Sequence, residues 1–324
     1  MKRRTGKTGT PMYNMDKLYE AVSCRGPVCV GLDTLADYIP PAARRGAVSD
    51  AEAVLAYNQA LIEATADIAA CYKVQIACYE ALGIAGLTAY AKTLKTLRDR
   101  GLLVIGDIKR GDIADTALSY AKAHFEGDFE ADFVTLSPYM GMDAIEPWLR
   151  YADAKGKGAF VLLRTSNRGM RDFAYRKLQS GGRVYDAVGE RLSALAAGRL
   201  GRYGYGAFGA VVGADPKTDA EREELAALRQ NHPRLFLLIP GYGAQGGGAG
   251  DAALLLRDGN GGVVNASRSI IRAWQDASAE GLDPGAGIPY AAEAARRAVL
   301  AMGEALRAAG SPASSSPRPA EGAA

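Results

Sequence analysis

The sequence has few cysteines, few histidines and no long apolar run. Four cysteines, none in a Cys-x-x-Cys pair, and two histidines occur among 324 residues. Reduced core thiols and surface or helix-end histidines are therefore expected, rather than a disulfide framework or a metal site. No stretch approaches the about 18 apolar residues of a membrane helix, and the N-terminus lacks the apolar core of a signal peptide. These absences predict a soluble cytoplasmic protein with no membrane partner.

Charge of either sign is nearly balanced, with 39 basic and 36 acidic residues and a net charge of +3. Four basic residues lie within the first ten positions and the last fifteen positions are neutral overall, which leaves −1 for the body. Such a body is not a basic nucleic-acid-binding surface, so no nucleic-acid partner is expected. We expect a flexible basic arm (1–12), one folded domain (13–309) and a disordered tail (310–324) rich in Pro, Ser and Ala.

Short apolar segments rich in strand-forming residues alternate with longer segments of helical periodicity. The predicted strands are residues 27–33, 71–76, 102–109, 133–138, 159–165, 207–214, 234–241 and 261–267. The predicted helical segments are residues 50–70, 84–100, 113–126, 142–154, 183–202 and 217–231. Fully apolar strands that alternate with helices indicate a parallel sheet covered on both faces, and eight units close an α/β (β/α)8 TIM barrel. An open doubly wound sheet is the alternative.

Charged residues lie at the C-terminal ends of the predicted strands, where a barrel places its active site. Asp107 and Lys109 are two positions apart and therefore share one face of a strand; a charged pair there is costly to desolvate, which favours a chemical role over a surface ion pair. Lys73 interrupts an apolar strand, although a solvated edge position remains open for it. Asp33 ends the first strand, although the role of an N-cap or a turn residue remains open for it. Their mutual pairing would hold both lysines protonated, as a lysine acid requires.

Two further groups of polar residues suit a phosphate and a heterocycle. The glycine-rich segment 240–248 follows the seventh strand and Arg268 follows the eighth, which is the usual phosphate site of this barrel. Ser166, with its neighbours in the sequence Thr-Ser-Asn, offers a hydroxyl to the polar edge of a ring; a plain polar loop is the alternative. Asp112 precedes a helical pattern and is equally consistent with a helix cap.

These residues together resemble the orotidine 5′-phosphate decarboxylase family, in its longer bacterial branch, over residues 27–271. The resemblance rests on Asp107-x-Lys109-x-x-Asp112-Ile113-Ala114-x-Thr116, Gly31-Leu32-Asp33, Lys73-x-Gln75, Pro240-Gly241-x-Gly243-Ala244-Gln245-Gly246 and Ser267-Arg268. The Asp-x-Lys-x-x-Asp motif also occurs in sugar-phosphate enzymes of the same superfamily. Lys73, together with the phosphate-site residues Gln245 and Arg268, makes the resemblance specific to the decarboxylases. The residues 168–182 form an insertion that we expect to belong to a closing lid.

The resemblance implies cofactor-free and metal-free decarboxylation of orotidine 5′-phosphate to uridine 5′-phosphate, the last step of UMP biosynthesis. Lys109 would protonate C6 as carbon dioxide leaves, Asp107 would orient Lys109, and Lys73 and Asp33 would contact the ribose. Because no electron sink lies next to C6, the protein must supply a preorganised ammonium for the developing charge.

The resemblance also assigns binding roles and an oligomeric state. Ser166 would read the pyrimidine amide edge, and Gln245, Gly246 and Arg268 would hold the phosphate. Asp112, with Thr116 near it, would reach the neighbouring subunit's site in a homodimer.

Two alternatives stay open. A magnesium-dependent sugar-phosphate decarboxylase or aldolase would need a carboxylate near the end of the second strand, where Lys73 stands and Glu80 is close. A catalytically silent phosphate-binding or RNA-associated module would use the basic arm. The intact Asp107, Lys109 and Asp112 argue against that silent module.

Overall fold

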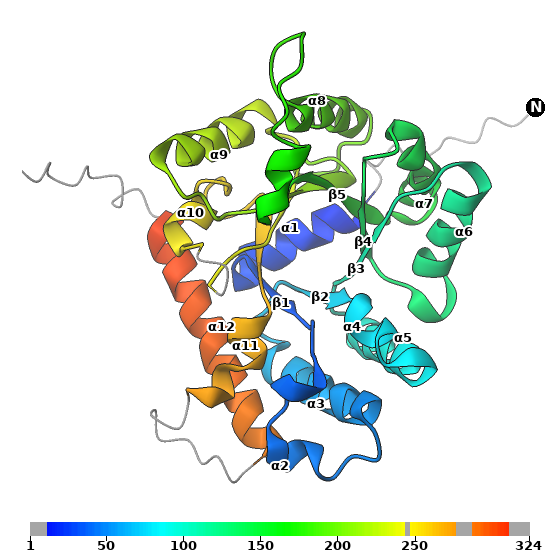
Figure 1. Ribbon diagram of the computed structural model, residues 1–324, viewed down its shortest axis with the longest axis vertical. Coiled ribbons are helices and arrows are strands. Elements are labelled where there is room, and N and C mark those ends of the chain that lie inside the picture. Colours follow the sequence, from blue (N-terminus) through cyan, green and yellow to red (C-terminus); the bar gives the residue numbers. More distant parts are fainter. Residues whose placement is uncertain (1–11, 244–246, 277–286, 311–324) are drawn as a thin grey trace, which may run out of the picture.

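The structure is a computed structural model that describes residues 12–243, 247–276 and 287–310. Within these ranges, eight parallel strands follow one another around a closed barrel, in sequence order (Figure 1). They are β1 (Val28–Gly31), β2 (Cys71–Gln75), β3 (Val104–Arg110), β4 (Phe133–Leu136), β5 (Gly158–Arg164), β6 (Phe208–Val212), β7 (Leu237–Ile239) and β8 (Gly262–Ala266). The predicted TIM barrel is confirmed, and because β1 pairs with β8 the open-sheet alternative is wrong.

Helices surround the barrel on its outside, and one of them, α1, crosses its N-terminal end (Figure 1). They are α1 (Asn14–Arg25), α2 (Pro41–Arg44), α3 (Asp50–Thr65), α4 (Ala77–Glu80), α5 (Gly83–Asp99), α6 (Ala114–Phe125), α7 (Leu149–Lys155), α8 (Val184–Ala197), α9 (Asp219–Asn231), α10 (Ala249–Ala253), α11 (Arg268–Ile271) and α12 (Ile288–Gly310). Each predicted helical segment contains a helix, although 142–154 begins with two short 3-10 turns before α7.

The long helices α1 and α12 were not among the predicted segments. The buried face of α12 repeats at helical spacing through Ala291, Ala295, Val299 and Met302. Alanine gives this face little hydrophobic contrast, which is why its periodicity is weak in the sequence. The helix packs against α3 and α10 and covers the outside of the barrel.

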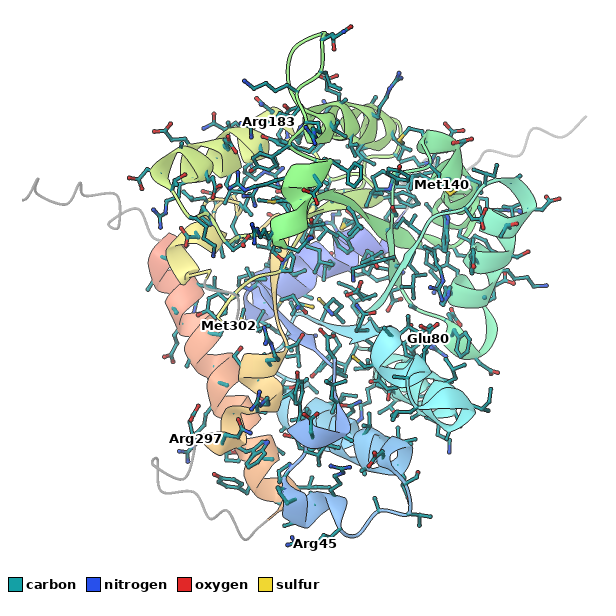
Figure 2. All side chains as sticks on the ribbon, in the orientation of Figure 1. Arg45, Glu80, Met140, Arg183, Arg297 and Met302 are labelled. Carbon is teal, nitrogen blue, oxygen red and sulfur yellow. The ribbon has the colours of Figure 1, made fainter. Side chains whose placement is uncertain are left out.

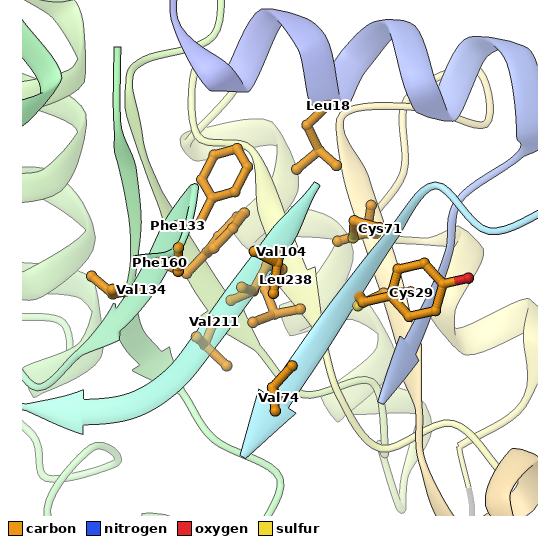
Figure 3. Packing of buried hydrophobic residues seen from close by; sticks show 14 of the residues in the cluster. Leu18, Cys29, Cys71, Val74, Val104, Phe133, Val134, Phe160, Val211 and Leu238 are labelled. Carbon is orange, nitrogen blue, oxygen red and sulfur yellow. The ribbon is translucent and has the colours of Figure 1, made fainter. Parts of the chain in front are cut away.

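The N-terminal half of the barrel interior is filled by apolar side chains. Figure 3 shows Leu18 of α1 pointing toward the strands beside Cys71, Val104 and Phe133. Phe133 fits because Gly158 lies on the neighbouring strand; a Cβ at Gly158 would lie 2.5 Å from the Phe133 ring. Large and small residues therefore interlock in this layer, and polar side chains are left to the opposite end of the barrel.

The scarce cysteines and histidines mostly lie inside. All four cysteines are free thiols; two are buried, one is half-buried and Cys24 is exposed. His124 and His232 lie at helix ends, one of the two positions expected for them, and both are buried. Among the described residues, no helix is both long enough and apolar enough to cross a membrane. Residues 1–11 and 311–324 of the predicted arm and tail lie outside the described residues.

Candidate active site

A cavity of about 450 Å³ opens at the C-terminal ends of the strands. Six of the predicted site residues line it, contributed by β2, β3, the loops after β1 and β5, and the start of α11: Asp33, Lys73, Asp107, Lys109, Ser166 and Arg268. Residues far apart in the sequence meet there because every parallel strand ends at the same rim.

Four charged side chains of alternating sign form a continuous chain along one wall of the cavity. The Lys73 Nζ lies 2.7 Å from Asp33 Oδ1 and 3.1 Å from Asp107 Oδ2. The Lys109 Nζ lies 2.6 Å from Asp107 Oδ1. Asp107 therefore bridges the two ammonium groups, and Lys73 bridges the two carboxylates. The expected mutual pairing of these residues is present.

Burial and neighbouring charges shift the pKa values of Asp107 and Lys73 in opposite directions. Burial alone would raise the pKa of Asp107, but Lys73 and Lys109 lower it to about 2. Burial would lower the pKa of Lys73, yet the attraction of Asp33 and Asp107 raises it above its ordinary value. Both groups stay charged at neutral pH as a result. Lys73 is only 4% exposed, and a closed barrel has no edge strand, so the solvated-edge alternative for it is wrong.

Asp33 is held from two sides rather than standing in a turn by itself. Its second carboxylate oxygen accepts a hydrogen bond from Ser267 Oγ at 2.9 Å, in addition to the contact with Lys73. Ser267 approaches the end of β1 closely because residue 31 is a glycine; a Cβ there would lie 1.9 Å from Ser267 Oγ. The first and last strands thus orient Asp33 together.

Two residues around Asp107 were not predicted as site residues. Gln75 Nε2 donates to Asp107 Oδ2 at 2.9 Å, and Thr135 Oγ1 donates to Asp107 Oδ1 at 2.8 Å. Gln75 was visible only as part of the Lys73-x-Gln75 pattern. Thr135 had no signal of its own, because one threonine inside an apolar strand is unremarkable for a β-former.

The expected phosphate end of the cavity is lined by Pro240, Gly241 and Tyr242 after β7 and by Arg268 at the start of α11. Gly241 and Gly243 have positive φ angles of 103° and 71°, a backbone conformation that favours glycine. Gln245 and Gly246, predicted as phosphate ligands, lie outside the described residues.

The loop after β5 brings Ser166 to the cavity, flanked by Thr165 and Asn167, which also line it. The loop after β6 lies directly against Ser166, since a Cβ at Gly213 would be 2.8 Å from the Ser166 Cβ. Arg164, fully buried at the end of β5, joins the two loops by donating to the Gly213 carbonyl at 2.8 Å. The close packing holds Ser166 at the rim.

The predicted lid segment, residues 168–182, does not line the cavity. It begins with the 3-10 turn Arg168–Asp172 and then runs out beside α8 and α9 (Figure 1). Tyr175 Oη donates to Glu224 Oε2 at 2.9 Å, and Arg183, labelled in Figure 2, pairs with Glu224 at 2.7 Å. These contacts attach the segment to α9.

Asp112 and Thr116 do not line the cavity of their own chain. Helix α6 begins at Ala114, its N-cap position is Ile113, and no side-chain cap hydrogen bond is present there. The helix-cap alternative for Asp112 is therefore not supported. Instead, the Asp112 carboxylate accepts a hydrogen bond from the Ile113 backbone N–H at 2.9 Å.

Glu80, the carboxylate that kept the magnesium-dependent alternative open, lies outside the cavity. It is on α4, half-exposed, and accepts a hydrogen bond from Arg110 at 3.4 Å (Figure 2). The end of β2 presents Lys73 and Gln75 to the cavity instead. The site thus lacks the carboxylate at β2 that this alternative needs.

Comparison with known proteins agrees with this geometry. Residues 26–281 match the model of the orotidine 5′-phosphate decarboxylase / HUMPS family. The orotidine 5′-phosphate decarboxylase of Clostridium perfringens strain SM101 is 52% identical over 260 residues, which is 80% of this chain and 89% of that protein. The Clostridium kluyveri enzyme of the same name is 51% identical over 261 residues, 81% of this chain and 88% of that protein.

A solved structure of Leishmania donovani OMP decarboxylase superposes with a TM-score of 0.67 at 33% sequence identity, covering 91% of this chain and 100% of that one. The family match covers most of the chain, including all eight strands and the charged residues of the cavity. The chain therefore belongs to the orotidine 5′-phosphate decarboxylase / HUMPS family.

Proposed function

We propose that this protein decarboxylates orotidine 5′-phosphate to uridine 5′-phosphate, the last step of UMP biosynthesis, without a cofactor or a metal. The observation that carries the proposal is the chain Asp33, Lys73, Asp107 and Lys109, held by contacts of 2.6 to 3.1 Å in the barrel cavity. The relatives at about half sequence identity carry the name of this reaction. Together they support the reaction and the residues that perform it.

The reaction needs one proton and a place for negative charge to develop. The bond from C6 to the carboxylate breaks, its electron pair stays on C6, and carbon dioxide leaves. Lys109 then donates a proton from Nζ to C6. Asp107 keeps that ammonium oriented, and the fixed charges do not have to reorganise as the carbanion forms.

Substrate binding uses the remaining rim residues. Lys73 and Asp33 contact the ribose hydroxyls, Ser166 reads the amide edge of the pyrimidine, and Arg268 holds the phosphate together with Gln245 and Gly246. Binding energy from the phosphate end offsets the cost of placing an anionic ring beside Asp107. In this scheme, the residues that bind the substrate are distinct from Lys109, which donates the proton.

The working form in this proposal is a homodimer in which Asp112 and Thr116 complete the neighbouring subunit's site. Support comes from exposed apolar residues beside them: Ile113, Tyr139 and Met140 are 43%, 80% and 48% exposed (Figure 2). They lie on the loops after β3 and β4, and the second of these loops begins beside the end of β3, where Ser137 N donates to Arg110 O. An apolar surface of this kind is suited to burial against a second copy.

The proposal places the protein in the cytoplasm, with orotidine 5′-phosphate as its small-molecule partner and neither nucleic acid nor membrane as a partner. Neither alternative function is favoured. Glu80 is too far outside the cavity to serve the magnesium-dependent reaction, and a silent phosphate-binding module has no need of four coupled charges. Burying charges of this kind is costly even when they are paired, which favours a chemical role for them over a purely structural one.

The test follows the loss of orotidine 5′-phosphate absorbance by chelator-treated protein, comparing the wild type with Lys109→Ala. Lys95→Ala is the matched control, because Lys95 is an exposed lysine on α5 that pairs with Asp99 one helical turn away. We expect full activity in the wild type and in the control, and loss of turnover in Lys109→Ala. Unchanged turnover in Lys109→Ala would remove Lys109 as the acid, and activity that appears only with added Mg²⁺ would favour the sugar-phosphate reaction.

A further inference from the structure

The β3 strand is irregular at the catalytic end, and one buried hydroxyl accounts for the irregularity. Gly106 pairs with Val134, but the next pair along the ladder is Arg110 with Leu136. Four residues of β3 thus advance while β4 advances by two. Thr135 is the β4 residue that faces this interruption, and it is 1% exposed.

Two backbone N–H groups of β3 at this interruption are hydrogen-bonded to the Thr135 side chain instead of to the β4 backbone. Ile108 N and Lys109 N donate to Thr135 Oγ1 at 3.0 and 2.9 Å, in place of carbonyl partners on β4. The same hydroxyl donates its own hydrogen to Asp107 Oδ1 at 2.8 Å. One oxygen therefore accepts hydrogen bonds from two backbone N–H groups that the interrupted ladder does not pair, and it donates one to a carboxylate that the two lysines and Gln75 also contact.

The backbone conformation of Lys109, next to this hydroxyl, is unusual for a lysine. Lys109 has a φ angle of 45°, in the left-handed region that a residue with a long side chain seldom adopts. The surroundings must therefore hold it there, and strained residues of this kind cluster at functional sites. In this conformation, the Lys109 Nζ lies 2.6 Å from Asp107 Oδ1, the oxygen that Thr135 also contacts.

We propose that Thr135 is a positioning residue for the decarboxylation: its hydroxyl holds the β3 bulge and thereby fixes Lys109 and Asp107 relative to each other. The inference rests on the proposed function, since it deepens the role of the proton donor. Thr135 acts through Lys109 and Asp107 and does not itself transfer a proton to the substrate. Its effect therefore falls on turnover more than on substrate binding, which the ribose and phosphate contacts determine.

The experiment compares Thr135→Val, Thr135→Ala and Thr135→Ser with the wild type in the absorbance assay, measuring kcat and KM separately. Valine keeps the shape of threonine but replaces the hydroxyl by a methyl group. Alanine also lacks the hydroxyl, and it places no methyl group against the backbone N–H groups of Ile108 and Lys109. Serine restores the hydroxyl. We expect kcat to fall about 10- to 100-fold in the valine and alanine variants, the range of one hydrogen bond to a charged group. KM should change less, and the serine variant should recover most of kcat.

The control is Thr93→Val, because Thr93 is equally buried but lies on α5, outside the cavity, and donates to Ala89 O at 2.8 Å. It should leave kcat unchanged. Binding of uridine 5′-phosphate, measured by calorimetry, should be retained in Thr135→Ala and shows that its cavity is intact.

The inference is overturned if Thr135→Val and Thr135→Ala turn over like the wild type, if the loss lies in KM alone, or if serine gives no recovery. An inactive wild type would instead refute the proposed function, which separates the two failures.

Discussion

Replacing Lys73 by methionine tests the electrostatic account of the site directly. Methionine has a similar length and no charge, so Lys73→Met leaves the carboxylates of Asp33 and Asp107 without the ammonium that joins them at 2.7 and 3.1 Å. Asp107 is buried and keeps only the half-exposed Lys109 as a cation. We expect a clear loss of stability at neutral pH, as well as a loss of activity.

The size of the stability loss follows from the pKa of Asp107. Holding that pKa at about 2, below its ordinary value of 3.8, is worth about 2.5 kcal/mol, at about 1.4 kcal/mol per pH unit. The charge of Lys73 is the largest single cause that lowers it. Breaking one side of a buried ion pair costs about 3 to 5 kcal/mol in general. We therefore expect Lys73→Met to lower the free energy of unfolding by about 3 kcal/mol at pH 7.

The pH dependence gives the prediction its sign. A carboxylate whose pKa is lowered by folding contributes stability that is complete above its unfolded pKa and is lost as the pH falls through its folded pKa. The wild type therefore has the full contribution of Asp107 at pH 7 and loses it between about pH 4 and pH 2. The stability gap between the wild type and Lys73→Met should be largest at pH 7 and should fall to roughly half at pH 3.

Equilibrium urea unfolding, followed by the fluorescence of Trp148 and Trp274, measures this gap. Both proteins are compared at one fixed concentration, because self-association makes apparent stability depend on concentration. Lys95→Met is the control, since its exposed ion pair with Asp99 should contribute less than about 1 kcal/mol. A gap below about 1 kcal/mol at pH 7, or one that stays constant on acidification, would refute the claim that Lys73 compensates buried carboxylates.

Three further predictions follow from the same geometry. Arg268→Ala should raise KM for orotidine 5′-phosphate by about 10- to 100-fold, as expected for loss of a charged phosphate contact, and unchanged KM in steady-state assays would contradict its role. Mixing inactive Lys73→Ala with inactive Asp112→Ala should restore part of the activity through hybrid dimers; no recovery despite subunit exchange, verified by mass spectrometry, would count against a shared site. Gly158→Ala should lower the melting temperature, because its Cβ would lie 2.5 Å from the Phe133 ring, and an unchanged melting curve would contradict that packing.

The sequence predicted the parts of the fold that depend on hydropathy. The eight strands were recognisable because a parallel barrel buries both faces of each strand, and Lys73 stood out because it breaks that pattern. Helix α12 was not recognisable, since its buried face is mostly alanine. The buried positions of His124 and His232 were missed because a single histidine carries no periodicity.

Within the candidate site, charge could be predicted and hydrogen bonding could not. Asp107 and Lys109 were placed together by strand alternation, yet the strand that carries them is not regular at that point, and Lys109 adopts a positive φ angle. The pairing is therefore maintained by Thr135 and not by alternation alone. A bulge depends on where backbone N–H groups find acceptors across the sheet, and that information is not contained in the order of residues along one strand.

The two layers of the barrel interior explain why catalysis is confined to one end. In the layer at the N-terminal ends of the strands, Phe133 fits because Gly158 leaves room, and such packing is determined by side-chain volume. In the layer at the C-terminal ends, a buried charge is tolerable only where an opposite charge or a hydrogen-bonding group lies within about 3 Å. Thr135 belongs to the same short strand as Phe133, two residues further on, and supplies such a donor. The change from volume to hydrogen bonding along β4 is therefore what allows a charged site to be built directly on an apolar core.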